Sequence, residues 1–95
     1  MKLVFLPSTR SDLMWMRTYY VHIFPDGAKR ATDQYLRTCG IISENPLVGR
    51  PVEEIEGVQE FSIPRTPFSF VYRIVEDRIE VLRVRDQRGD RSRLT

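Results

Sequence analysis

The sequence predicts an α+β fold in which a helical hairpin packs on a small, mainly antiparallel sheet, with the element order β-α-α-β-β-β. Apolar residues recur at helical intervals in the first half of the chain and at alternating positions in the second half. The 95 residues, 41% hydrophobic and 29% charged, suffice for one core of two layers. We therefore expect a single domain over residues 1–88, followed by a flexible basic tail over residues 89–95.

The chain is expected to begin with a short strand and a long helix. The strand covers residues 3–6, and Pro7 ends it. Thr9 and Asp12 have the spacing of a capping box, so the first helix should begin near Thr9. The apolar face of this helix consists of Leu13, Met16, Tyr20, Ile23 and Phe24. Pro25 then ends the helix.

A second helix is expected after the tight connection at residues 25–27, where Asp26 is a candidate cap. Its apolar stripe consists of Ala28, Ala31, Tyr35, Cys39 and Ile42. Two helices joined so tightly should lie antiparallel, and the small Ala28 and Ala31 permit a close approach. Cys39 lies on this stripe, which indicates a small buried hydrophobic residue rather than a nucleophile.

The second half has the alternation of β-strands. We expect strands over residues 59–63, 68–75 and 79–84, with a loop at residues 64–67 and a hairpin turn at residues 76–77. The middle strand is only partly polar on its second face. It should therefore be central in the sheet and covered on both faces.

The positive charge is concentrated towards the C-terminus. Residues 1–58 contain seven basic and seven acidic residues, whereas residues 59–95 contain eight arginines, no lysine and six acidic residues. The whole net charge of +2 therefore comes from the second segment. Arginine suits planar, bidentate recognition of carboxylate or phosphate. The last strand and the tail are thus expected to contact an anionic partner, or else to be a solvated strand edge and a frayed end.

Cysteine and histidine usage bounds the compartment and the chemistry. A single cysteine excludes an internal disulfide and fits the reducing cytoplasm, where we expect the protein to act. No apolar run approaches the roughly 20 residues that span a bilayer, and residues 3–6 are too short for a signal peptide. His22 has no carboxylate at a metal-binding spacing, so neither a metal nor a cofactor is expected.

Trp15, Tyr19 and His22 form a second stripe along the first helix. The helix already has one apolar face, so this stripe either docks a partner or packs against the sheet or the other helix. The sequence leaves both interpretations open.

Three sequence segments of the second half occur in a fixed order. They are N-P-x-x-G-R-P at residues 45–51, G-V-x-E at residues 57–60 and V-Y-R-I-V-E-D-R-I-E-V-L-R-V at residues 71–84. Together with the element order, they resemble the ParE/RelE toxin superfamily, and most closely its ParE-like branch of plasmid-stabilisation toxins. The resemblance implies a RelE/ParE-like fold and the toxin of a type II toxin–antitoxin system. Such a toxin arrests growth, inhibits DNA gyrase and is neutralised by a cognate antitoxin in a hetero-oligomer.

The RelE-like branch implies an alternative function, ribosome-dependent cleavage of messenger RNA without a metal ion. Cleavage needs a group to activate the 2′-hydroxyl, a cation and a proton donor. The candidate residues for these roles are Arg83, Arg73, Arg65 and Tyr72. However, the alternation around Tyr72 favours packing in the core, and Asp86 stands where many relatives carry histidine. We therefore assign no catalytic residue and expect a toxin that acts by binding.

The candidate residues for binding the target or the antitoxin are Arg73, Arg83, Arg85, Arg88, Gln59, Trp15 and Tyr19. Gln59 departs from the resemblance, because relatives commonly carry arginine there. This departure adds a third hypothesis, an attenuated family member that acts mainly as an antitoxin-binding module. The antitoxin itself is expected to contribute an acidic, apolar segment that crosses the helical hairpin and pairs with Arg73, Arg83 or Arg85.

Overall fold

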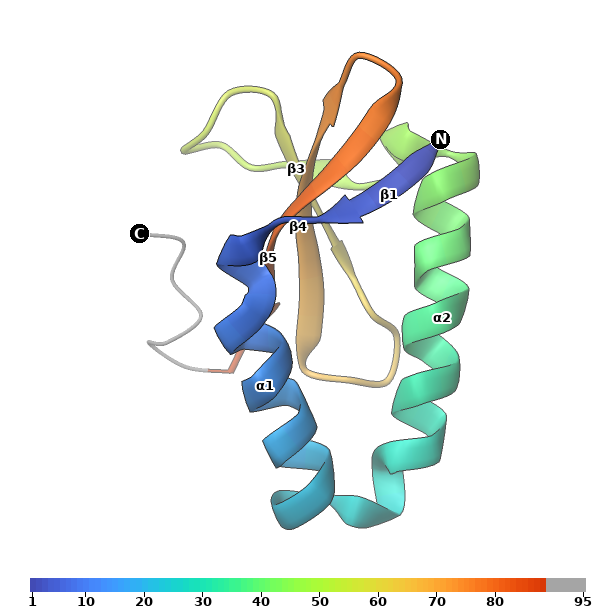
Figure 1. Cartoon of the computed structure of the whole chain (residues 1–95), viewed down its shortest axis with the longest axis vertical. Helices are drawn as coiled ribbons and strands as arrows, with labels where there is room; N and C mark the ends of the chain where they lie inside the picture. Colours follow the sequence, from blue (N-terminus) through green and yellow to red (C-terminus); the bar gives the residue numbers. More distant parts are fainter. Residues whose placement is uncertain (89–95) are drawn as a thin grey trace.

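The chain folds into one sheet with two helices on one of its faces, and the computed structural model describes residues 1–88. The strand order is β1-β5-β4-β3-β2. The strands are β1 (Lys2–Phe5), β2 (Arg50–Pro51), β3 (Val58–Ser62), β4 (Phe68–Val75) and β5 (Arg78–Asp86). The helices α1 (Arg10–Thr18) and α2 (Ala28–Glu44) run antiparallel and converge at their connection (Figure 1). The predicted α+β class is confirmed. Within residues 1–88, no helix is long and apolar enough to cross a membrane.

The sheet has one strand more than predicted. β2, expected as part of a loop, pairs antiparallel with β3 at the sheet edge, where Pro51 costs no ladder hydrogen bond on its outer side. At the other edge, β1 pairs parallel with β5. Beyond Phe5 the edge of β5 is covered by side chains of the following segment. Ser8 Oγ donates to the Leu82 carbonyl at 2.7 Å, and Asp12 Oδ2 accepts the Val84 N–H at 2.9 Å.

A β-bulge in β5 decides which side chains point to each face of the sheet. Tyr72 lies opposite Val81 whereas its neighbour Val71 lies opposite Arg83, so Leu82 is an extra residue in β5. Because side chains alternate along a strand, the extra residue reverses the phase of β5. Before the bulge the odd-numbered residues face the helices, and after it the even-numbered residues do. Arg83 therefore lies on the face away from the helices, which we call the outer face.

The core lies between the other face, called the inner face, and the helices. The sheet contributes Phe68, Phe70, Tyr72, Ile79, Val81 and Val84. The helical segments contribute Tyr20, Ala31 and Ile42. β4 lies between β3 and β5, and its first five residues are buried, so its predicted central position is confirmed. Cys39 is half-buried against this core, and burial raises the pKa of its thiol, which fits the expected packing role.

The start of α1 differs from the predicted capping box. Thr9 precedes the helix, but its hydroxyl donates to the Leu6 carbonyl at 2.7 Å and not to the helix. Asp12 instead binds the Arg83 side chain and the Val84 N–H. The prediction was wrong because the uncovered edge of β5 takes the carboxylate that would have supported the cap. Asp26 likewise makes no capping hydrogen bond to α2.

A π-helical turn, Tyr19–Ile23, continues α1 to the hairpin tip. The Phe24 N–H bonds to the Tyr19 carbonyl at 2.8 Å, five residues back. This wider turn shifts the phase of the helix. Ile23 and Phe24 consequently lie 57% and 48% exposed, and their predicted place on the buried face was wrong.

Candidate functional site

Arginines of the outer face are paired with buried carboxylates. Near the β4–β5 turn, Glu80 holds two of them. Arg73 Nη2 lies 2.8 Å from Glu80 Oε1, and Arg78 Nη2 lies 2.9 Å from Glu80 Oε2. Hydrogen bonds from Arg73 and Arg78 lower the pKa of Glu80, so this carboxylate stays charged.

Two further pairs lie beyond the bulge. Arg83 donates to Asp12 of α1 through Nε at 2.8 Å and Nη2 at 3.0 Å, which raises the pKa of Arg83. Arg85 Nη1 lies 3.1 Å from Glu60 Oε1, and Ser69 Oγ donates to Glu60 Oε2 at 2.5 Å. Glu60 therefore joins β3, β4 and β5 through its two oxygens.

These pairs share one arrangement, in which the carboxylate is more buried than the guanidinium group, although Asp12 reaches Arg83 from α1 at the edge of β5. The side chains of Glu60, Glu80 and Asp12 are only 9–11% exposed, whereas those of the four arginines are 30–48% exposed. We call Arg73, Arg78, Arg83 and Arg85 the arginine layer. The buried carboxylates fix the planes of these guanidinium groups, so the outer face presents positively charged edges in set orientations.

A separate cluster joins the end of β5 to α1 on the inner side. The Asp86 carboxylate accepts hydrogen bonds from Arg88 Nε at 2.9 Å, Arg88 Nη2 at 2.8 Å and Trp15 Nε1 at 2.8 Å. The Arg88 guanidinium also lies 4.2 Å from the centre of the Tyr19 ring. Arg88 and then Trp15 hold the pKa of Asp86 well below its usual range. Trp15 and Tyr19 therefore pack against the sheet, whereas His22 is exposed.

Tyr72 and Gln59 hold the loop that precedes β2. Tyr72 Oη donates to the Pro46 carbonyl at 2.7 Å and accepts the Gly49 N–H at 3.0 Å. Gln59 Nε2 donates to the Gly49 carbonyl at 3.0 Å. Burial raises the pKa of the Tyr72 hydroxyl. The packing role expected for Tyr72 is confirmed, and Gln59 has a structural partner on the inner side of the sheet.

The structure does not bring the candidate ribonuclease residues together. Tyr72 lies on the inner face, whereas Arg73 and Arg83 lie on the outer face. Arg65 is in the β3–β4 loop with a φ of 63° and lines a recess at the hairpin tip with Asp26. Among residues 1–88, no group of three His, Cys, Asp or Glu side chains is placed to hold a metal ion. The expected tail, residues 89–95, lies outside the described residues.

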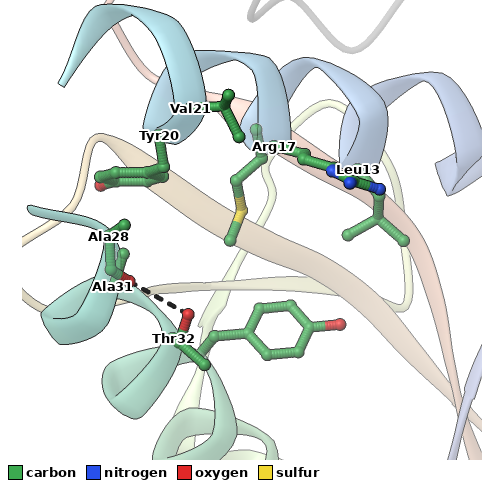
Figure 2. A pocket seen from close by; sticks show the side chains of 9 residues that line it. Leu13, Arg17, Tyr20, Val21, Ala28, Ala31 and Thr32 are labelled. Atoms are coloured by element: carbon green, nitrogen blue, oxygen red, sulfur yellow. Dashed lines mark hydrogen bonds between the residues drawn. The ribbon is translucent and has the colours of Figure 1, made fainter. Parts of the chain in front are cut away.

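A groove of about 340 Å³ runs between α1 and α2. Figure 2 shows side chains of the two helices facing one another across it. Its mostly apolar lining includes Leu13, Met16, Tyr20, Val21, Ala31 and Tyr35. Arg17 and Thr32 contribute polar atoms. The helices therefore approach each other near their connection, where Ala31 is buried, and leave the groove open farther along.

Comparison with known proteins identifies the family to which this arrangement belongs. The chain matches the family model described as "ParE toxin of type II toxin-antitoxin system, parDE" over residues 3–91. The chain belongs to the ParE toxin family. Its fold is similar to a solved structure described as "Chromosomal ParDE TA system from P. aeruginosa", with a TM-score of 0.69 and 29% sequence identity. That match covers 88% of this chain and 92% of the other. A search of curated proteins finds no match. The resemblance inferred from the sequence is thus confirmed.

Sequence reasoning missed the carboxylates of this ParE-family toxin. It identified Arg73, Arg83, Arg85 and Arg88 but missed Arg78 and all four carboxylate partners, which are Asp12, Glu60, Glu80 and Asp86. For Glu60 and Glu80 a signal existed, because each occupies an outward position in an alternating strand. For Asp12 none existed, because its partner Arg83 lies 71 residues away and faces outward only through the bulge.

Proposed function

We propose that this ParE-family toxin arrests growth by binding and inhibiting DNA gyrase in the cytoplasm, and that a cognate antitoxin neutralises it in a hetero-oligomer. Membership of the ParE family supports the antitoxin partner. The choice of gyrase rests on the ParE-like resemblance, and the choice of binding over cleavage rests on the geometry of the arginine layer.

The observation that carries the proposal is the pairing of every arginine in this layer with a buried carboxylate. Cleavage of RNA requires a base, a cation and a proton donor around one phosphate. Among residues 1–88, the Tyr72 hydroxyl is committed to backbone groups on the opposite face of the sheet, and His22 lies on α1's π-helical extension. Fixed cations without a neighbouring proton donor favour binding of an anionic surface over catalysis.

A supercoiling assay tests the target. Purified toxin is added to gyrase and relaxed plasmid, and supercoiling is expected to fall with toxin concentration and to recover when antitoxin is added. A type I topoisomerase reaction serves as the control and should be unaffected. Unchanged supercoiling, together with in-frame cuts in messenger RNA mapped by primer extension after induction, would establish the ribonuclease alternative instead.

Gln59 tests the attenuated-toxin hypothesis. Its amide holds the Gly49 carbonyl on the inner side of the sheet, so its structural role does not require a positive charge. We expect a Gln59→Arg variant to arrest growth as strongly as the natural chain. A markedly stronger arrest by this variant would favour attenuation at Gln59.

The groove between α1 and α2 supports the proposed antitoxin site. An acidic, apolar helix could bury its apolar face there and place carboxylates near Arg17. Thr32→Trp should narrow the groove and weaken antitoxin binding by about tenfold, which corresponds to about 1.4 kcal/mol. Lys29→Trp, at an exposed position outside the groove lining, is the matched control. Equal affinities of the two variants in titration calorimetry would exclude this site.

A further inference from the structure

The outer face of the sheet combines fixed cations with a lack of exposed apolar and aromatic side chains. The arginine layer spans β4 and β5, the two longest strands. Exposed large hydrophobic residues in residues 1–88 lie on the helices, at the chain start or in loops: Met1, Met14, Val21, Ile23, Phe24, Leu36, Leu47 and Ile55. Val58 and Val71, the valines beneath the layer, are at most 5% exposed.

This composition distinguishes between classes of partner. Protein–protein interfaces have an apolar centre and are depleted in charged residues there, whereas protein–DNA interfaces are polar and positively charged. The outer face has no apolar centre to offer a protein. Its guanidinium groups match phosphate geometry, and phosphate contacts need no apolar surface.

The aromatic residues argue against single-stranded RNA. Sequence-tolerant binding of single strands uses aromatic rings on which bases stack. The chain has ten aromatic residues, as five Phe, four Tyr and one Trp. Nine of them belong to the core or pack against it, and Phe24 lies at the hairpin tip. The outer face therefore offers contacts to a backbone but none to unstacked bases.

The guanidinium groups retain donors for a ligand. Arg73, Arg78 and Arg83 use Nε and Nη2 for their carboxylates, and within residues 1–88 their Nη1 groups make no hydrogen bond. In Arg85 only Nη1 holds Glu60. Within residues 1–88, Nη2 makes no hydrogen bond, and Nε is buried without a hydrogen-bond partner. In each arginine of the layer, some guanidinium nitrogens bind a carboxylate and fix the orientation of the group. At least one other nitrogen remains available to a ligand.

We infer that the arginine layer on the outer face binds the phosphate backbone of duplex DNA. This goes beyond inhibition of gyrase, because it assigns to the toxin a direct contact with nucleic acid and a surface for it. In a complex of gyrase with DNA, the toxin would hold the nucleic acid through this face. DNA binding is measured without gyrase. A toxin that binds no DNA would therefore leave gyrase inhibition as proposed, and a toxin that does not inhibit gyrase would leave DNA binding as inferred.

The test is a salt titration with a labelled duplex of about 20 base pairs, followed by fluorescence anisotropy between about 50 and 200 mM salt. Four phosphate contacts predict a slope of about −3.6 for log K against log salt concentration, with a dissociation constant on the order of 10⁻⁵ M. A slope near zero would overturn the inference.

Variants of the layer separate fixed guanidinium groups from overall charge. The double variant Glu60→Gln/Arg85→Gln leaves the net charge unchanged and leaves no buried carboxylate alone. It should reduce the magnitude of the slope by about 0.9. The control Arg30→Gln/Arg37→Gln removes two exposed charges from α2 and should leave the slope unchanged. If the control weakens binding as much as the layer variant, overall charge is responsible and the inference is wrong.

A second variant, Arg78→Gln, serves as a test in a protein that is expected to stay folded. Two other ligands then test the class of partner. Arg78→Gln leaves Glu80 paired with Arg73, so the fold should persist while the slope again falls by about 0.9. Circular dichroism verifies the fold. Tighter binding of a polyglutamate peptide than of duplex DNA would assign the face to an acidic protein. Tighter binding of single-stranded RNA would assign it to a transcript, and either result would overturn the inference.

Discussion

Asp86→Asn is expected to destabilise the toxin by about 2 kcal/mol at neutral pH. The Asp86 side chain is only 4% exposed and accepts hydrogen bonds from Trp15 and from Nε, Nη2 and the backbone N–H of Arg88. Removal of one member of a buried ion pair costs about 3–5 kcal/mol, and a charged hydrogen bond contributes about 1.5–3 kcal/mol. The Arg88 side chain is 43% exposed and stays hydrated when its partner is removed. The cost should therefore lie in the range of a charged hydrogen bond, at about 2 kcal/mol.

The effect should depend on pH in a defined direction. The folded-state pKa of Asp86 is lowered, so its contribution is fully present above the ordinary carboxyl pKa of about 3.9 and is lost as pH falls towards the folded-state value. The stability difference between the natural chain and Asp86→Asn should thus be constant between pH 5 and 7. It should shrink below about pH 4.

Urea unfolding followed by tryptophan fluorescence and circular dichroism measures this difference. A loss of 2 kcal/mol corresponds to a fall in Tm of roughly 8–16 °C for a domain of this size. The matched control is Asp33→Asn, whose exposed pair with Lys29 at 3.5 Å should contribute less than about 0.5 kcal/mol. Equal unfolding free energies for the two variants, or a difference independent of pH, would refute the role given to Asp86.

Two further substitutions probe the loop held by Tyr72, and a third probes α2. Tyr72→Phe should cost about 1 kcal/mol in urea unfolding, because the partly buried Gly49 N–H and Pro46 carbonyl lose their hydrogen-bond partner; an unchanged midpoint would contradict the role given to the hydroxyl. Gly49→Ala should lower Tm, since its Cβ would lie 2.6 Å from Tyr72 Oη and 3.0 Å from the Glu60 carbonyl. Gly40→Ala is the opposite case: it lies inside α2 with no atom within 4 Å of an added Cβ, so it should raise stability by about 0.5–1 kcal/mol. A decrease in Tm for Gly40→Ala would contradict the open surroundings of this position.

Elements with a strong local pattern could be predicted from the sequence. The alternation at residues 68–75 identified the central strand, and the apolar stripe at residues 28–42 identified α2. α2 buries one continuous face, which leaves a helical period in the sequence, whereas β4 is covered on both faces and appears as a mainly apolar run of strand length.

Features that depend on distant partners could not be predicted. The capping box failed because Asp12 bonds to β5, and the buried face at the hairpin tip failed because a π-turn altered the helical period. β2 has two residues, too few for any period, and exists only because β3 lies beside it.

The candidate site also has features that could be predicted from the sequence and features that depend on distant partners. The arginines at 73, 83 and 85 were identified by residue type alone. The alternation of β4 gives the face of Arg73, but the faces of Arg83 and Arg85 were beyond prediction, because the bulge at Leu82 reverses the alternation of β5. Without it, Arg83 and Arg85 would point into the core. The aromatic pair of Trp15 and Tyr19 was equally ambiguous until the Asp86 cluster showed which surface covers it.

The strand order has a consequence for the synthesis of this toxin. In the described sheet, β1 has β5 as its single neighbour, and Asp12 binds residues 83 and 84. A nascent chain therefore carries its first strand and helix without their partners until β5 has left the ribosome. The arginine layer is incomplete before that moment, because Arg78, Arg83, Arg85 and the carboxylate of Glu80 all lie on β5. A cell that produces the toxin therefore contains the folded protein only after β5 has been translated. An antitoxin synthesised earlier can bind the toxin from that moment.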